Sequence, residues 1–300
     1  MSEPADRVTA FIDLHSHTTA SDGSFTPSEL IALAKRTGLA ALSITDHDTF
    51  DGYEQALPIA REAGLDLVRG IELNSRLFLP AVENPLYVHV LGYFPTGDAS
   101  SEFNDWLSGE RDDRRSRNRR LVEALQNRDV DITLEEVEAR GRSLAGRAHF
   151  AHILVDKGYA RNSEDAFQRY LGQNAPSYVE RQSLSTAEVI AIIRAGGGIP
   201  VVAHPIRLRL PREQEREVLL DLKRSGLLGL EVYHSDHPPE FQADYRQLAE
   251  ELDLLPTGGS DFHGAPKPGI SLGTGLDGNV RVPVEFVERL RAFSVASWNG

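Results

Sequence analysis

The residues best suited to chemistry in this 300-residue chain are histidines and carboxylates that follow short apolar segments. His15 and His17 come directly after an apolar run, residues 8–12, that predicts a strand entering the core. Residues two apart in a strand point the same way, so both imidazoles project from its carboxyl end. Two neutral imidazoles side by side make half of a metal site, although one such pair alone is weak evidence.

Further histidines and acids lie near the predicted strands. Asp22 lies in the loop after His17, and His89 lies within a later predicted strand. The others stand at the ends of later strands: Asp46, His47, Asp48, Glu72, His204, Asp261 and His263. A lone histidine at a strand end is a hydrogen-bonded structural residue in roughly two cases out of three, and His149, His152 and His237 fit that description. Asp46 also fits a loop cap. Repetition at several strand ends favours metal binding, because burying many imidazoles and acids together is costly without a neutralising cation.

The composition narrows the choice of metal and of partners. The chain has no cysteine, which leaves histidine and carboxylate as ligands and favours Mn, Fe, Zn or Mg in a hydrolytic role. A formal charge of −13 disfavours nonspecific binding to duplex DNA, but bound cations can reverse the sign inside a pocket that takes a small anion. With no long apolar run and no signal-peptide pattern, we expect no membrane partner and a cytoplasmic location.

Apolar patterning and helix caps predict alternating strands and helices in two parts of the chain. Strands are predicted at 11–14, 40–44, 65–73, 87–94, 199–203, 228–233 and 254–257, and helices at 27–36, 53–62, 187–195, 211–225, 239–251 and 283–293. This rhythm predicts an α/β protein with a parallel sheet or barrel. In such a barrel the carboxyl ends of all strands face one way, so the polar clusters should meet in one cup.

The rhythm breaks in the middle of the chain. Helices without strands are predicted at 103–127, 133–139, 149–157 and 163–171. We therefore predict one barrel domain made of residues 8–100 and 182–300, and a small helical subdomain inserted at 101–181 that caps the active site.

The insertion carries an arginine-rich stretch, Glu110–Arg120, with two interpretations of about equal weight. One is a solvated helix face on which the acids pair with the arginines. The other is that one or two arginines face the metal cup and hold a phosphate group by bidentate hydrogen bonds.

Taken together, the motifs resemble those of the PHP family (polymerase and histidinol phosphatase), in that family's order. They are Asp13-Leu14-His15-Ser16-His17, Ser21-Asp22-Gly23, Ile44-Thr45-Asp46-His47-Asp48, Gly70-Ile71-Glu72, His89-Val90-Leu91-Gly92, Ala203-His204-Pro205 and Gly259-Ser260-Asp261-Phe262-His263. The resemblance implies a distorted (βα)7 barrel, the PHP fold, with two to three divalent metal ions. It also points to the branch that acts on nucleotides, whose members carry a helical insertion.

Carried over residue by residue, the resemblance implies three metal sites. The first is held by His15, His17 and Asp261, with Glu72 bridging to a second site that His89 and His204 complete; the third is held by Asp22, His47 and His263. Histidinol-phosphatase members usually have histidine at the position of Asp22, which disfavours that substrate. The segment Gly146-Arg147-Ala148-His149 resembles a Gly-Arg-x-His segment of the nucleotide branch, which implies phosphate contacts from Arg147 and His149, followed by Arg114 and Arg115.

We therefore expect a metal-dependent phosphoesterase in which hydroxide activated by the metals attacks a phosphate ester. The expected substrates are a nucleoside 3′,5′-bisphosphate, an AMP-like monophosphate or the 5′ end of a short RNA. His234 is a candidate general acid, with a bound water as the alternative. Two other functions stay open: a phosphatase of another small metabolite such as histidinol phosphate, and a non-catalytic metal-binding module. The sequence leaves the oligomeric state open.

Overall fold

A computed structural model describes residues 10–80, 84–141, 145–180 and 184–293 of the chain. Contacts among these residues divide the chain into two compact units. The first unit ends at Ser100 and continues from Leu184, and the second unit begins at Ser101 and occupies the stretch between them. Within the described residues, no helix combines the length and the apolar character needed to cross a membrane.

The first unit is built on one eight-stranded sheet with the order β10-β1-β2-β3-β4-β5-β6-β7. Its strands are β1 (Phe11–Asp13), β2 (Ala41–Ile44), β3 (Asp66–Leu77), β4 (Leu86–Phe94), β5 (Ile199–Val202), β6 (Gly229–Tyr233), β7 (Leu255–Gly258) and β10 (Val282–Pro283). The sheet nearly closes into a barrel, because the backbone beyond β1 hydrogen-bonds to the end of β7 and the loop after it, from Leu14 N–H to the carbonyl oxygen of Gly258 (3.1 Å) and from His17 N–H to that of Phe262 (2.9 Å).

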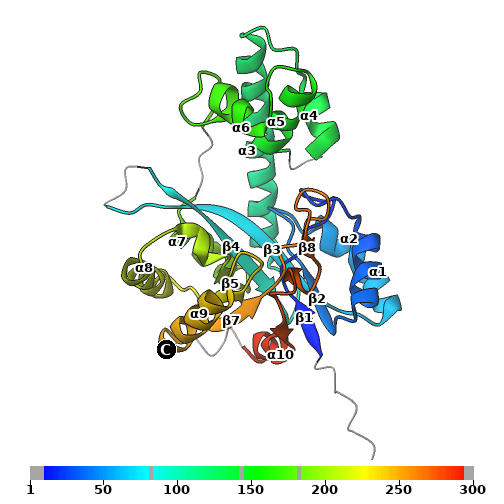
Figure 1. The fold of residues 1–300 in the computed structure, drawn as a ribbon, viewed down its shortest axis with the longest axis vertical. Helices are drawn as coiled ribbons and strands as arrows, with labels where there is room; N and C mark the ends of the chain where they lie inside the picture. Colours follow the sequence, from blue (N-terminus) through cyan, green and yellow to red (C-terminus); the bar gives the residue numbers. More distant parts are fainter. Residues whose placement is uncertain (1–9, 81–83, 142–144, 181–183, 294–300) are drawn as a thin grey trace, which may run out of the picture. The chain divides into compact units, whose positions relative to one another are not determined.

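The predicted parallel sheet is present, but two of its strands run antiparallel to their neighbours. β4 pairs antiparallel with both β3 and β5, and β10 pairs antiparallel with β1. For β4 the physical reason is that β3 and β4 form a long hairpin (Figure 1). Only residues 78–85 separate them, too few for the crossover connection that parallel neighbours need. The remaining neighbours, from β1 to β3 and from β5 to β7, are parallel.

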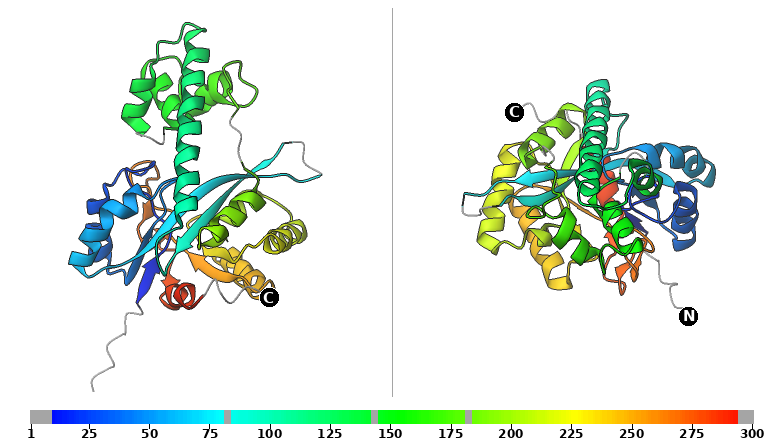
Figure 2. Two further views of the ribbon diagram at one scale, coloured as in Figure 1. Left: turned by 180° about the vertical axis from the view of Figure 1, so that it is seen from behind. Right: turned by 90° about the horizontal axis from the view of Figure 1, so that it is seen from above.

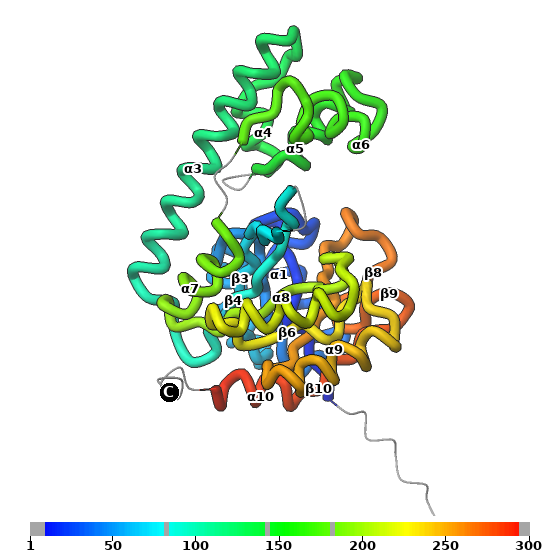
Figure 3. The backbone as a smooth tube through the Cα atoms, turned by 90° about the vertical axis from the view of Figure 1, so that its left-hand side faces the viewer, coloured from blue at the N-terminus to red at the C-terminus, as the bar shows by residue number. Residues whose placement is uncertain are grey.

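Helices cover the outside of the sheet on either side of this hairpin (Figure 2). They are α1 (Pro27–Thr37), α2 (Asp51–Ala63), α7 (Thr186–Ala195), α8 (Arg212–Arg224), α9 (Pro239–Glu251) and α10 (Glu285–Ala292). The start of α1 follows from its sequence: Thr26 and Glu29 form a capping box, Pro27 occupies the first turn, and Gly38 ends the helix in the left-handed conformation. After β7 the chain forms a small hairpin of β8 (Ile270–Ser271) and β9 (Gly275–Leu276). It then returns to the sheet with β10, and α10 follows (Figure 3).

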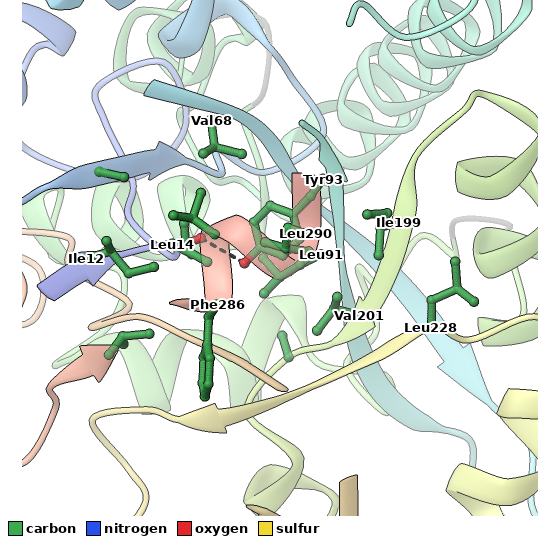
Figure 4. Close-up of a cluster of buried hydrophobic side chains, with 14 of the residues drawn as sticks. Ile12, Leu14, Val68, Leu91, Tyr93, Ile199, Val201, Leu228, Phe286 and Leu290 are labelled. Atoms are coloured by element: carbon green, nitrogen blue, oxygen red, sulfur yellow. Dashed lines mark hydrogen bonds between the residues drawn. The ribbon is translucent and has the colours of Figure 1, made fainter. Parts of the chain in front are cut away.

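Apolar side chains from nearly every strand fill the inside of the barrel (Figure 4). Leu14, Leu91 and Val201 are fully buried in this core. Tyr93 is buried among them, and its hydroxyl donates a hydrogen bond to the carbonyl oxygen of Leu14 at 2.8 Å. This core fixes the backbone directly beneath His15 and His17, since Leu14 precedes them.

The second unit consists of α3 (Ser101–Gln126), α4 (Leu134–Gly141), α5 (Arg147–Asp156), α6 (Ser163–Ala166) and the short π-helix η2 (Phe167–Leu171). It has its own apolar core, in which Leu125, Val137, Phe150 and Leu154 are fully buried. The predicted helices of residues 101–181 are therefore present, close to their expected bounds.

Candidate metal centre

The loops that leave β1 and β7 run side by side and carry the first group of candidate ligands. Asp261 N–H donates to the carbonyl oxygen of His15 at 2.8 Å, and Ser16 forms a parallel bridge with Phe262. This pairing continues the barrel beyond its strands, so His15 and His17 lie beside Asp261 and His263. The rings of His17 and His263 have centroids only 4.1 Å apart.

Glu72, on β3, lies in the middle of the cluster. One carboxylate oxygen, Oε2, lies 3.4, 3.2 and 3.2 Å from ring nitrogens of His15, His17 and His47. The other, Oε1, lies 2.8 Å from His89 Nδ1 and 3.1 Å from His204 Nε2. A single carboxylate thus contacts five imidazoles from four segments of the chain.

Sheet pairing explains how His47 and His89 reach Glu72. The loop after β2 continues alongside β3, with a parallel bridge between His47 and Glu72. On the other side, Glu72 is paired with Leu91 of β4, so His89 lies two residues along on the same face. The antiparallel direction of β4 places the first half of that strand next to the carboxyl end of β3.

Asp22 and Asp261 are two further acids whose carboxyl groups lie close to the histidines of the cluster. Asp22 lies 3.6, 3.7 and 3.3 Å from nitrogens of His17, His47 and His263. Asp261 Oδ1 lies 3.4 to 3.5 Å from nitrogens of His15, His17 and His263.

The structure therefore brings together all nine residues that the sequence analysis named as metal ligands. Four groups have donor atoms close enough to share one ion: His17 with Asp22, His47 and His263; His15 with His17 and Glu72; His47 with Glu72 and His89; and His15 with Glu231 and His234. The grouping differs in detail from the sequence-based assignment, because His17 and His47 each face two groups. Which ligand holds which ion stays a prediction.

The chemistry of these donors fits a cation. The Nε2 atoms of His15 and His17 and Nδ1 of His47 are buried and make no hydrogen bond in the structure. Burial lowers the pKa of His47 and of His204 to about 3, so both imidazoles are neutral at pH 7 and offer lone pairs. Burial also lowers the pKa of His17, but Asp261 and Glu72 outweigh it and raise that pKa to about 9.

Sequence reasoning missed Glu231, which orients two of the histidines. Its Oε1 lies 2.9 Å from His15 Nδ1, and its Oε2 accepts a hydrogen bond from the backbone N–H of His204 at 2.6 Å. Burial opposes its ionisation, but His15 and His234 outweigh burial and lower its pKa to about 2. The signal in the sequence that could have revealed it is a glutamate inside the otherwise apolar segment of β6.

Two cations were missed as well. Arg207, in the short 3-10 helix η3 (Pro205–Leu208), and Lys267 lie 3.0 and 2.6 Å from Asp261 Oδ2. Both side chains are partly exposed, at 37% and 29%. They place positive charge at the rim of the cluster, where an anionic group can reach it.

His234 is in the cluster, but its ring is fully buried and both nitrogens are engaged. Nε2 lies 3.1 Å from Asp261 Oδ2, and Nδ1 accepts a hydrogen bond from Asp236 N–H at 2.9 Å. Its predicted role as a general acid stays a prediction. Asp46 accepts hydrogen bonds from Thr18 and Ser21, which confirms the alternative of a loop cap.

The predicted substrate contacts lie in the second unit, and their role stays a prediction. Arg114 is buried, whereas Arg115 is exposed and makes two hydrogen bonds to Glu138, at 2.6 and 3.2 Å. The Arg147 guanidinium lies 5.6 Å from the ring centroid of Tyr178. His149 Nδ1 accepts a hydrogen bond from Gly146 N–H at 3.1 Å, at the start of α5.

Comparison with known proteins adds independent information. A family model described as PHP domain matches residues 13–182. The chain is 31% identical to a 5′-3′ exoribonuclease of Haemophilus influenzae, over 88% of this chain and 94% of the relative. It is 29% identical to a 3′,5′-nucleoside bisphosphate phosphatase of Chromobacterium violaceum, over 88% of this chain and 91% of the relative. A candidate metal-dependent phosphoesterase of known structure from Bifidobacterium adolescentis superposes with a TM-score of 0.74 at 34% identity, covering 97% of both chains.

Proposed function

Because the chain belongs to the PHP domain family, we propose that it is a metal-dependent phosphoesterase that hydrolyses phosphate esters of nucleotides or of short RNA 5′ ends. The observation that carries this proposal is the position of Glu72, whose carboxylate contacts five imidazoles in a buried cluster. Burying so many ionisable groups together is costly unless cations occupy the site.

We propose that the ions are held as the family resemblance implies. His15, His17 and Asp261 would hold one, Glu72 would bridge to another completed by His89 and His204, and Asp22, His47 and His263 would hold a third. Divalent ions bound there supply a Lewis acid for the phosphoryl oxygens and lower the pKa of a water molecule. The same ligands accept Mn, Fe or Zn, so the residues support a divalent metal without selecting one.

The residues of the chain would orient the substrate. Arg207 and Lys267 contact Asp261 from the rim of the cluster, at 3.0 and 2.6 Å. At this rim both side chains would contact the non-bridging oxygens of a bound phosphate, the arginine through its planar fork and the lysine as a point charge. His234 would orient Asp261, and its burial favours a water molecule as the proton donor to the leaving oxygen.

The nucleotide character of the substrate is supported by the two relatives described above, which align with nearly the whole chain. In the second unit, Arg147, His149, Arg114 and Arg115 remain the proposed contacts to a second phosphate or to the rest of the strand. A phosphatase of another phosphorylated metabolite is the alternative.

The test is phosphate release from a nucleotide panel in the presence of Mn²⁺, using a nucleoside 3′,5′-bisphosphate, AMP and a short 5′-phosphorylated RNA. We expect release from at least one of them, and a loss of at least about a thousandfold in His17→Ala. His152→Ala is the matched control, because His152 is exposed on α5. If wild type and His17→Ala are equally inert on every substrate, the non-catalytic interpretation replaces this proposal.

A further inference from the structure

A cavity of about 500 Å³ lies in the first unit, beside the metal cluster but lined by other residues. Its walls come from η3 and the segment after it, from the first turns of α8 and from α9. The lining residues are Ile206, Arg209, Leu210, Arg212, Glu215, Phe241, Asp244 and Tyr245. A volume of this size suits a ligand of the size of a nucleotide.

One of the lining residues carries a buried carboxyl group. Glu215 is only 7% exposed, and one of its oxygens, Oε1, accepts a hydrogen bond from the Tyr245 hydroxyl at 3.1 Å. Among the described residues, no ion pair involves Glu215. Burial raises its pKa to about 7, so the group is available both as a neutral donor and as an acceptor near neutral pH.

The outer part of the cavity combines an aromatic face with positive charge. The Phe241 ring is 40% exposed, and its centroid lies 6.2 Å from that of Tyr245. Arg212 is paired with Asp244, whereas the structure records no ion pair of Arg209 with any described residue.

We propose that this cavity binds a nucleoside monophosphate, with its base stacked on Phe241, the edge of the base hydrogen-bonded to Glu215 and its phosphate on Arg209. A carboxyl group pairs well with the donors and acceptors on the edge of a base, and an exposed aromatic ring provides a face for stacking. The Arg209 guanidinium, which has no ion pair among the described residues, provides the phosphate contact. The choice of a nucleotide rests in part on the proposed function, because a nucleotide phosphoesterase meets such ligands as substrates and products.

The position of η3 connects this site to the metal cluster. Arg207 contacts Asp261 at 3.0 Å, while Ile206 and Arg209, on either side of it in sequence, line the cavity. Arg209 holds a backbone φ of 53°, a left-handed conformation that is costly for an arginine and typical of functional segments. A ligand that contacts Arg209 would therefore affect the position of η3, which carries Arg207.

The test is calorimetric titration of AMP into the metal-free protein, with chelator present, so that hydrolysis plays no part. The titration is carried out on the wild type and on His17→Ala. We expect one AMP site, weakened about tenfold or more by Phe241→Ala and by Arg209→Gln. Arg209→Gln should leave adenosine binding unchanged, since adenosine lacks the phosphate.

Arg224→Gln, on the exposed end of α8, is the matched control and should leave AMP affinity unchanged. Failure of AMP to bind, AMP affinity that neither Phe241→Ala nor Arg209→Gln alters, or ribose 5-phosphate binding as tightly as AMP would each overturn the proposal. Phosphate release is measured separately, so a protein that binds AMP in this way without hydrolysing any substrate would refute the proposed function and leave this site intact.

Discussion

Glu72 shows how the surroundings of one side chain set its chemical state. Burial opposes the negative charge, but the imidazoles of His89, His47 and His15 outweigh it and hold the pKa of this carboxyl well below its ordinary value. The group is therefore a carboxylate with two oxygens facing different histidines, which is the form that can bridge two cations. Its neighbour His204 is neutral at pH 7, because burial lowers the pKa of His204 to about 3, and this keeps its lone pair available.

Glu231 offers a test of how much a residue behind the ligands contributes. Glu231→Gln keeps the shape of the side chain. It replaces one of the two carboxylate oxygens, which face His15 Nδ1 and the backbone N–H of His204, with an NH₂ donor. We expect metal affinity to fall by about 10- to 100-fold, measured by titration against a competing chelator. Glu217→Gln, an exposed position on α8, should bind as the wild type does. Equal affinity in Glu231→Gln would mean that His15 is held by the barrel alone.

Among the elements, the loops after β1 and β7 and the small β8–β9 hairpin are held together by Asp13. Its buried carboxylate accepts hydrogen bonds from the backbone N–H groups of His15 (3.1 Å), Ser260 (3.0 Å) and Gly273 (2.7 Å), and from the Ser260 hydroxyl (2.5 Å). These donors lie in three segments: the loop after β1, the loop after β7 and the β8–β9 hairpin. The first segment is more than 240 residues from the other two in the sequence. Asp13 therefore positions His15 relative to Asp261 without touching either ligand atom.

We expect Asp13→Asn to lower the free energy of unfolding by about 2–4 kcal/mol, since an amide N–H₂ would face donors in a buried network. The measurement is urea unfolding followed by circular dichroism. Asp105→Asn, at an exposed position on α3, is the control and should change stability by less than about 0.5 kcal/mol. A wild-type unfolding curve for Asp13→Asn would show that the three segments hold together without this clamp.

The contact between α8 and α9 makes stability depend on pH. Burial raises the pKa of Glu215 to about 7 from 4.5, while the Tyr245 hydrogen bond and Arg212 act in the opposite direction. The folded state therefore binds the proton more tightly than the unfolded chain, so this group's contribution is full below pH 4.5 and is lost as pH rises through 7.

Between pH 5 and 8 we expect the ionisation of Glu215 to lower the free energy of unfolding of the wild type by on the order of 1 kcal/mol. Glu215→Gln cannot ionise, and its free energy of unfolding should fall less over the same range. Urea unfolding at both pH values gives the comparison, with Glu217→Gln as the control that retains the wild-type slope. Parallel pH profiles for wild type and Glu215→Gln would contradict the raised pKa.

For the molecule as a whole, the net charge of −13 and the buried acids of the cluster make bound cations a source of stability. A ligand that binds only the folded state at a hundredfold excess over its Kd adds about 2.7 kcal/mol. We therefore expect chelation to lower the melting temperature of the metal-loaded protein by about 5 °C or more, measured by calorimetry.

Glu72→Gln is the variant that isolates the cluster in this experiment. Without the bridging carboxylate, addition of Mn²⁺ should shift the melting temperature little. A shift as large as that of the wild type would place the stabilising ions elsewhere on the surface.

Local signals in the sequence were sufficient to predict the elements. Capping boxes, left-handed glycines and apolar periodicity depend on neighbours a few residues away, which is why α1, α7 and the strands lie close to their predicted bounds. Most of the histidines and acids were recognisable for a similar reason, since they stand at the ends of apolar segments.

Contacts between distant segments were decided only by the tertiary structure. The direction of β4 depends on its pairing with β3 and β5, and no local pattern encodes that choice. The same holds for the contacts of Glu231: its place inside an apolar strand makes it unusual, but only folding places it against His15, 216 positions away. A sequence shows which side chains can carry charge or bind metal; which of them meet depends on the closing of a barrel whose first and last parallel strands are more than 200 residues apart.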